Sequence, residues 1–218
     1  DRVANTTNFN GTKLLDGTFK AGNFQVGADA GQTITVGSIT DAQLTGMGSV
    51  DSANLEVGVS AMTGYATAIS AGDMTINGED IGAIGAAGSD DERAAQLVEA
   101  INRVSGRSGV HAFIEDDKLK LTSAKAIAVA GTANAVISSG FADGSQATAK
   151  SATMAELDIS TYSGAQLAVR QADEALKQIN TARANLGAVQ SRFENAISNI
   201  QISSENTAAA RSRIMDTD

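Results

Sequence analysis

The stretch that decides the fold is ALKQINTARANLGAVQSRFENAISNIQISSENTAAARSRIMDTD, residues 175–218. It has no proline and only one glycine, so nothing in it stops an α-helix. Apolar or small residues recur at the first and fourth positions of a heptad that begins at Ala172. This pattern predicts one long heptad helix from about residue 164 to the end of the chain. The packing residues predicted for its seam are Ala172, Ile179, Leu186, Val189, Phe193, Ile200 and Ile214.

The predicted helix has no matching partner in the rest of the chain. At about 1.5 Å per residue, residues 172–214 span roughly 65 Å, about twice the width of a small domain. A long amphipathic helix lying on a globular core is the alternative, but such a helix needs a broader apolar face. Residues 1–160 offer no second helix of this length, because glycine interrupts them every few positions. We therefore expect the partner to lie in another chain or upstream of residue 1.

Composition excludes several classes of function. The 218-residue chain carries a net charge of −9 and has no Cys. The acidic balance argues against nucleic-acid binding, and no apolar run is long enough for a membrane span. Without Cys there is no disulfide, thiol nucleophile or Cys-zinc site. Residues 163–218 are neutral overall, so the negative charge lies in residues 1–162 and indicates a change of architecture between them.

Short alternating runs in the middle of the chain predict strands. DMTIN, residues 73–77, ends in the turn pair Asn77-Gly78, which favours a hairpin. Residues 110–114 and 119–122 flank a polar turn and predict a second hairpin. Between these hairpins the sequence predicts a helix.

That helix is predicted over residues 89–105. Ser89 and Glu92 have the spacing of a capping box, and apolar residues recur behind them at helical spacing. Gly106 follows as the expected stop.

We find no pattern that predicts a catalytic, cofactor-binding or metal site. His111 is the only histidine, so neither a Ser-His-Asp triad nor an H-E-x-x-H zinc site is readily built. It is expected to be an outward polar residue on a strand. The acidic clusters at residues 79–80, 90–92 and 115–117 lack the spacing of a calcium loop. The glycines of residues 82–88 predict a loop rather than a phosphate cradle.

Three stretches resemble bacterial flagellins. Residues 175–218 resemble the C-terminal shaft helix of that family, most specifically in LGAVQSRFENAI and ARSRIMDTD. DRVANTTNFNGTKLLDG and the following NFQVGADAGQTITV resemble the region where the N-terminal shaft helix ends and β-hairpins begin. The strand–helix–hairpin unit DMTINGEDIG…AAQLVEAINRVSG…GVHAFIEDDKLKLTS resembles a repeat inserted in flagellins and hook proteins, where it forms an outer domain.

The resemblance implies an α+β fold with two domains. An elongated shaft domain of residues 1–47 and 151–218 would combine the long C-terminal heptad helix with β-hairpins. Residues 48–150 would form a small inserted α+β outer domain that faces solvent.

The resemblance also implies a function: a structural, non-enzymatic subunit of the flagellar filament, outside the cell and exported without a cleaved signal peptide. The N-terminus has no basic-then-apolar signal segment. Flagellins have further helical segments before and after the region matched here, and those segments line the inner tube and drive polymerisation. We therefore expect this chain alone not to polymerise, and the upstream helix to be the native partner of the seam.

Four polar residues are predicted to make contacts: Arg2, Arg183, Gln190 and Arg211. The last three each follow a seam residue by four positions, where they would border a helix–helix contact. By resemblance they would touch neighbouring subunits or the vertebrate receptor that senses flagellin; a solvated rim is the alternative. Because the strongest receptor determinants of the family lie on the upstream helix, we do not expect this chain to activate the receptor.

Two other functions stay open. A hook–filament junction protein has the same architecture, although LGAVQSRFENAI favours the filament subunit. A surface adhesin or glycan-binding module in residues 48–150 would need an aromatic platform or a polar cleft, and Tyr65, Phe113 and Phe141 are the aromatic residues available there.

Overall fold

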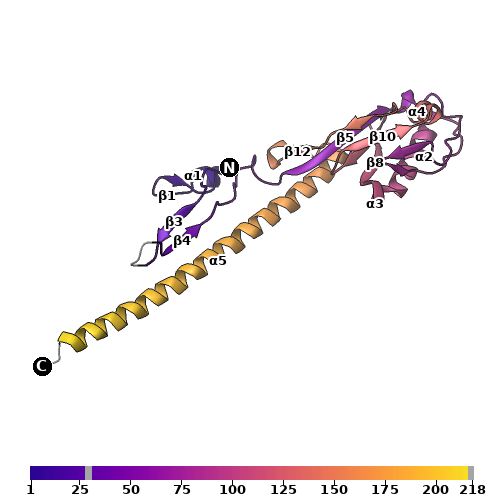
Figure 1. Cartoon of the computed structure of the whole chain (residues 1–218). Helices are drawn as coiled ribbons and strands as arrows, with labels where there is room; N and C mark the ends of the chain where they lie inside the picture. The colour runs from indigo at the N-terminus through magenta and orange to yellow at the C-terminus, as the bar shows by residue number, and fades with distance from the viewer. Residues whose placement is uncertain (28–30, 216–218) are drawn as a thin grey trace. The chain divides into compact units, whose positions relative to one another are not determined.

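The computed structural model describes residues 1–27 and 31–215 and combines strands with one very long helix, α5 (Tyr162–Met215) (Figure 1). The chain divides into two compact units, Asp1–Gly48 with Ala172–Asp218, and Ser49–Gln171. The predicted mixture of helix and strand and the long C-terminal helix are both confirmed. The predicted boundaries of an inserted outer domain stay a prediction. Within the described ranges, no helix has the length and apolarity needed to cross a membrane.

The unit of residues 49–171 is built on two four-stranded antiparallel sheets. One sheet has the order β12-β5-β9-β8, with β12 at Lys150–Ala152, β5 at Val50–Gly58, β9 at Lys118–Ser123 and β8 at Val110–Glu115. The other has the order β11-β10-β6-β7, with β11 at Gln146–Ala147, β10 at Ile127–Gly131, β6 at Met74–Ile76 and β7 at Glu79–Asp80. The remaining elements are η1 (Val59–Ala61), α2 (Asp90–Arg103), α3 (Ser105–Ser108), α4 (Ala133–Ser139) and η2 (Met154–Glu156).

Alternation along the strands creates the core of this unit. In β9, Leu119 and Leu121 are fully buried, whereas Lys118, Lys120 and Thr122 lie on the opposite face. Helix α2 packs against β8, and its core face is formed by Ala94, Leu97, Ala100 and Ile101. One continuous apolar cluster therefore stabilises residues 49–171.

The predicted hairpin turns are confirmed. Asn77 and Gly78 have φ angles of 51° and 81°, and Asp116 and Asp117 have φ angles of 53° and 56°. Two successive residues in the left-handed backbone conformation give the turn a twist that matches the right-handed twist of its strands, as in a type I′ hairpin. His111 is exposed on β8, as expected from the alternation of that strand.

Helix α2 begins as predicted but ends earlier. The Ser89 Oγ accepts from the Glu92 N–H at 3.2 Å, and the Glu92 carboxylate accepts from the Gly88 N–H at 2.7 Å. In a capping box the Glu92 carboxylate would accept from the N–H of the N-cap residue Ser89; here it accepts from the preceding residue, Gly88. The prediction that Gly106 stops the helix is wrong: α2 ends at Arg103, and Gly106 lies inside the short helix α3. Gly109, with φ of 71°, adopts the left-handed conformation that ends α3.

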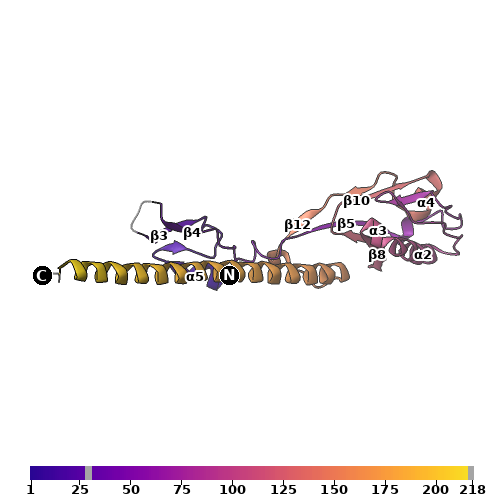
Figure 2. The ribbon, with the colours of Figure 1, turned by 60° about the horizontal axis from the view of Figure 1, so that its bottom comes forward.

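The other unit combines most of α5 with two small hairpins, of which the β3–β4 hairpin is labelled in Figure 2. This unit has very little apolar core. Its elements are α1 (Arg2–Thr6), β1 (Asn8–Phe9), β2 (Thr12–Lys13), β3 (Gly22–Gln25) and β4 (Thr33–Val36). Among its described apolar residues, Ala4, Ile34 and Ala175 are buried. Hydrogen bonds also hold this unit together, such as the one that the Gly48 N–H donates to the Gln178 Oε1 at 3.1 Å. Apolar burial within the chain therefore contributes little to this unit.

We expect truncation of the α2 core to destabilise the unit of residues 49–171 specifically. Leu97 is fully buried, so Leu97→Ala should lower the free energy of unfolding by about 2–5 kcal/mol. Denaturant titration followed by circular dichroism measures this loss. The exposed neighbour Glu99, changed to Ala, is the matched control and should stay within about 0.5 kcal/mol of the parent. Equal effects of the two variants would contradict the placement of α2 on the core.

Candidate functional site: the exposed face of the long helix

The first-position and fourth-position residues of the predicted seam on α5 differ in burial. Among the fourth-position residues, Ala175 is buried and Val189 is half-buried. At the first positions, Ile179, Leu186 and Ile200 are 40%, 43% and 46% exposed. Residues 35–40, at the end of β4 and after it, line a cavity of about 280 Å³ with the fourth-position residues Ala182 and Val189 and the first-position residue Leu186. The chain therefore buries the fourth positions of its seam more fully than most of the first positions.

Phe193 is the first-position residue that the chain does cover. Its ring meets the ring of Phe24, on β3, edge to face, with centroids 5.6 Å apart. Such a pair contributes about 0.5–1.5 kcal/mol beyond the apolar area that it buries. This contact fastens the hairpin to the helix. Sequence analysis did not single out Phe24, because no local pattern relates it to a residue so far along the chain.

An apolar stripe is left exposed along α5, and we call it the open stripe. Its residues occupy the first and fifth heptad positions, which lie side by side because they are four residues apart. It comprises Ala172, Leu176, Ile179, Leu186, Ile197 and Ile200. Leu176 and Ile197, at 59% and 53% exposed, lay outside the predicted seam. Their spacing of four from Ala172 and Phe193 is the sequence signal that identifies them.

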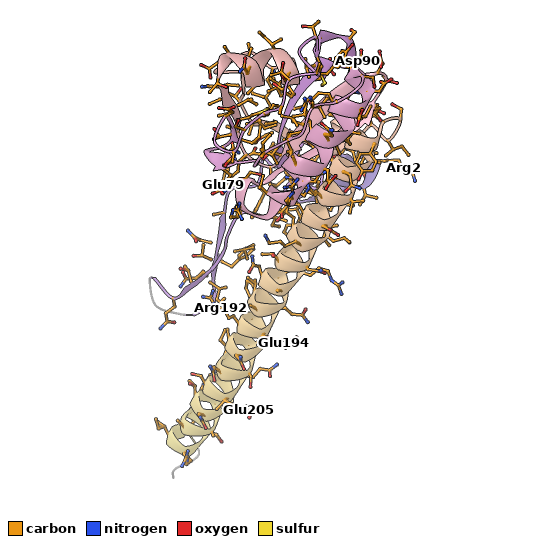
Figure 3. The ribbon with its side chains drawn as sticks, turned by 90° about the vertical axis from the view of Figure 1, so that its right-hand side faces the viewer. Arg2, Glu79, Asp90, Arg192, Glu194 and Glu205 are labelled. Atoms are coloured by element: carbon orange, nitrogen blue, oxygen red, sulfur yellow. The ribbon has the colours of Figure 1, made fainter. Side chains whose placement is uncertain are left out.

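The predicted contact residues on α5 lie in the same row as Leu176 and Ile197. Arg183, Gln190 and Arg211 are exposed at fifth positions. Gln190 donates to the Glu194 carboxylate at 2.9 Å, whereas neither arginine forms an ion pair within the residues described. Figure 3 shows charged side chains, such as Arg192, Glu194 and Glu205, spaced along the helix rather than clustered.

Arg2 lies apart from this row in the chain, exposed on α1. Among the hydrogen bonds of the described residues, none joins the Arg2 side chain to Arg183, Gln190 or Arg211. A single surface that contains all four predicted contact residues stays a prediction.

The C-terminal part of α5 is solvent-exposed along its described length. Every residue from 201 to 215 is exposed, including Ile202 at 54% and Ile214 at 77%. A helix in water owes most of its stability to tertiary packing of its apolar face. Apolar burial among the described residues therefore contributes little to the stability of this segment. Among residues 1–27 and 31–215, no group of three or more His, Cys, Asp or Glu side chains is placed to hold a metal ion.

The start of α5 is held by a carboxylate. Within the unit of residues 49–171, the Glu115 carboxylate accepts from the Tyr162 N–H at 2.7 Å and from the Lys120 Nζ at 2.8 Å. The hydrogen bond from Lys120, followed by that from Tyr162, lowers the pKa of Glu115. The same ion pair raises the pKa of Lys120. Glu115 therefore links the β8–β9 hairpin to the first turn of the helix.

Two families of known proteins match separate parts of the chain. The bacterial flagellin C-terminal helical region matches residues 169–218, and the flagellin hook IN motif matches residues 73–125. Polar flagellin A of Vibrio parahaemolyticus is 35% identical over 224 residues, which cover 100% of this chain and 57% of that protein. Flagellin B of Vibrio cholerae is 36% identical over 229 residues, with the same coverage of both chains.

The chain is similar to flagellins along its whole length. The resemblance drawn from the sequence is thus confirmed, and the chain spans 57% of the length of these flagellins. Among solved structures, FliC from Burkholderia pseudomallei is similar at 20% identity with a TM-score of 0.42, covering 88% of this chain and 79% of that one. The open stripe and its border lie largely within the matched flagellin helical region.

The Glu115 linkage predicts a pH-dependent stability. Its pKa is lowered in the folded chain, so its contribution is present above the ordinary carboxyl pKa of about 4.3 and is lost as the pH falls below it. Glu115→Gln should lower the melting temperature at pH 7 and show little difference from the parent near pH 3. Thermal melts monitored by circular dichroism test this. An equal deficit at both pH values would contradict the ion-pair explanation, and Glu99→Gln is the exposed control.

Proposed function

We propose that this chain serves as a structural subunit of the bacterial flagellar filament and that α5 is its main packing element. The observation that carries the proposal is the open stripe: a set of exposed apolar residues on one side of a helix whose own unit has almost no core. The partner on the stripe is a neighbouring subunit or a helical segment of the same protein outside residues 1–218. Arg183, Gln190 and Arg211 border that contact.

The energetics of burial support this proposal. Covering a half-exposed Leu or Ile side chain contributes roughly 1 kcal/mol or more, and the stripe offers several in a row. A second helix would thus stabilise the unit that the chain leaves poorly packed. The small stripe residue Ala172 allows close approach of such a helix at this point.

The proposed role is mechanical and requires no catalysis. Many copies pack side by side, the long helix resists bending, and residues 48–150 form a domain that faces the medium outside the cell. We propose residues 1–47 and 151–218 as the shaft, with export that does not involve a cleaved signal peptide. Contact of Arg2, Arg183, Gln190 and Arg211 with a flagellin-sensing host receptor is part of this proposal.

Immunogold electron microscopy of the source cells, with an antibody against residues 48–150, tests the role and the outward domain together. We expect gold along the whole filament. Gold confined to the filament base would instead identify a hook–filament junction protein, and label on the cell body beside bare filaments would overturn a flagellar role.

A charge placed in the open stripe should abolish assembly without unfolding the subunit. Ile197→Glu in the full-length protein puts a carboxylate in the proposed apolar contact, where burial of an unpaired charge is costly. We expect cells that carry only this variant to lose filaments and swimming motility.

Asn195→Glu is the matched control, because Asn195 is exposed on the same helix but lies away from the stripe. It should leave filaments intact, and both purified variants should melt like the parent. Normal filaments from Ile197→Glu would contradict the proposed packing surface.

A further inference from the structure

A cavity of about 500 Å³ lies within the unit of residues 49–171. It is bounded by the outward face of β8 and β9 and by the first turns of α5. Its volume is within the range of small-molecule sites in proteins, about 300–1,000 Å³. Its lining includes none of the residues of the open stripe.

One wall of this cavity is aromatic. The rings of Phe113 and Tyr162 are tilted by 58° with centroids 4.9 Å apart. Tyr162 is 56% exposed, so the pair presents apolar surface at the mouth of the cavity. The two rings come from different elements: Phe113 lies on β8 and Tyr162 begins α5.

The other walls carry hydrogen-bonding groups that the protein leaves unused. His111, Thr122 and Gln166 line the cavity, and their side chains make no hydrogen bond within the part of the chain that the structure describes. A cavity that combines an apolar wall with a few unpaired polar groups is typical of a site that orients a polar ligand.

The charge of the cavity is opposite to that of the chain. Arg170 lines it, and its Nη2 donates to the Asp51 carbonyl oxygen at 2.8 Å, which holds the guanidinium in position. The other guanidinium donors remain for a ligand. No carboxylate is among the lining side chains, although the chain carries a net charge of −9. The cavity therefore favours an anion over a cation.

We propose that this cleft binds an acidic sugar of the hexuronic acid class, either free or at the end of a polysaccharide. Arg170 and His111 face its carboxylate, Thr122 and Gln166 its hydroxyl groups, and the Phe113–Tyr162 wall its apolar C–H face. Arginine suits this role because its planar fork matches a carboxylate. The inference is independent of the proposed filament role.

The test is an NMR titration of the ¹⁵N-labelled 218-residue chain with glucuronate, with glucose as the neutral control. We expect saturable shifts of the amides of His111, Phe113, Thr122 and Gln166, with a dissociation constant on the order of 1–10 mM, and at least tenfold weaker binding of glucose. Arg170→Gln should weaken glucuronate binding at least tenfold and His111→Ala about threefold, while Asn195→Ala, at an exposed position of α5 outside the cavity lining, leaves it unchanged.

A trimer of galacturonate separates the two sources of the sugar. Tighter binding of the trimer than of the monomer points to a polysaccharide end, and tighter binding of the monomer points to the free sugar. His111→Ala also controls for misfolding. The His111 side chain is exposed and makes no hydrogen bond among the described residues, so its removal should not unfold the chain. No saturable shift up to 50 mM glucuronate, or equal binding of glucose and glucuronate, would overturn the proposal.

Discussion

The unmet packing requirement of α5 is the constraint on which the rest of this structure depends. A heptad helix of 54 residues presents more apolar surface than residues 1–48 can cover. The β3–β4 hairpin occupies one edge of the seam through the contact of Phe24 with Phe193. The opposite edge stays open. Exposed apolar surface of this extent is unfavourable in water, which supports the proposed association of α5 with another helix.

The unit of residues 49–171, in contrast, buries its apolar side chains against one another. Its sheets and α2 share one apolar cluster, so its stability does not require a partner. It also buries Arg93 completely, with the guanidinium donating to the carbonyl oxygens of Tyr65 and Thr67. Burial lowers the pKa of Arg93, and the negative charge of the neighbouring Glu92 opposes that shift in part. No carboxylate accepts a hydrogen bond from Arg93 among the hydrogen bonds of the described chain. Two backbone carbonyls thus take the place of a counter-ion.

Local features of this unit were predictable because their causes lie within a few residues. The turn at Asn77-Gly78 follows from the left-handed backbone that these two residue types tolerate. Ser89 caps α2 because its hydroxyl can reach the N–H three residues on. The end of α2 was not predictable in the same way. Gly106 and Gly109 offer the same local signal, and the tertiary position of β8 decides which of them takes the left-handed conformation.

The sequence by itself determined that α5 is long and one-faced, because heptad spacing places Ile179, Leu186 and Ile200 on one side of any helix that they form. Only the tertiary structure decided which edge of that face is covered, because Phe24 reaches Phe193 from a hairpin remote in the sequence. It also decided that Phe113 and Tyr162 share one cavity wall. Helical periodicity is a property of neighbouring residues, whereas these contacts depend on how distant segments fold together, for which no local pattern exists.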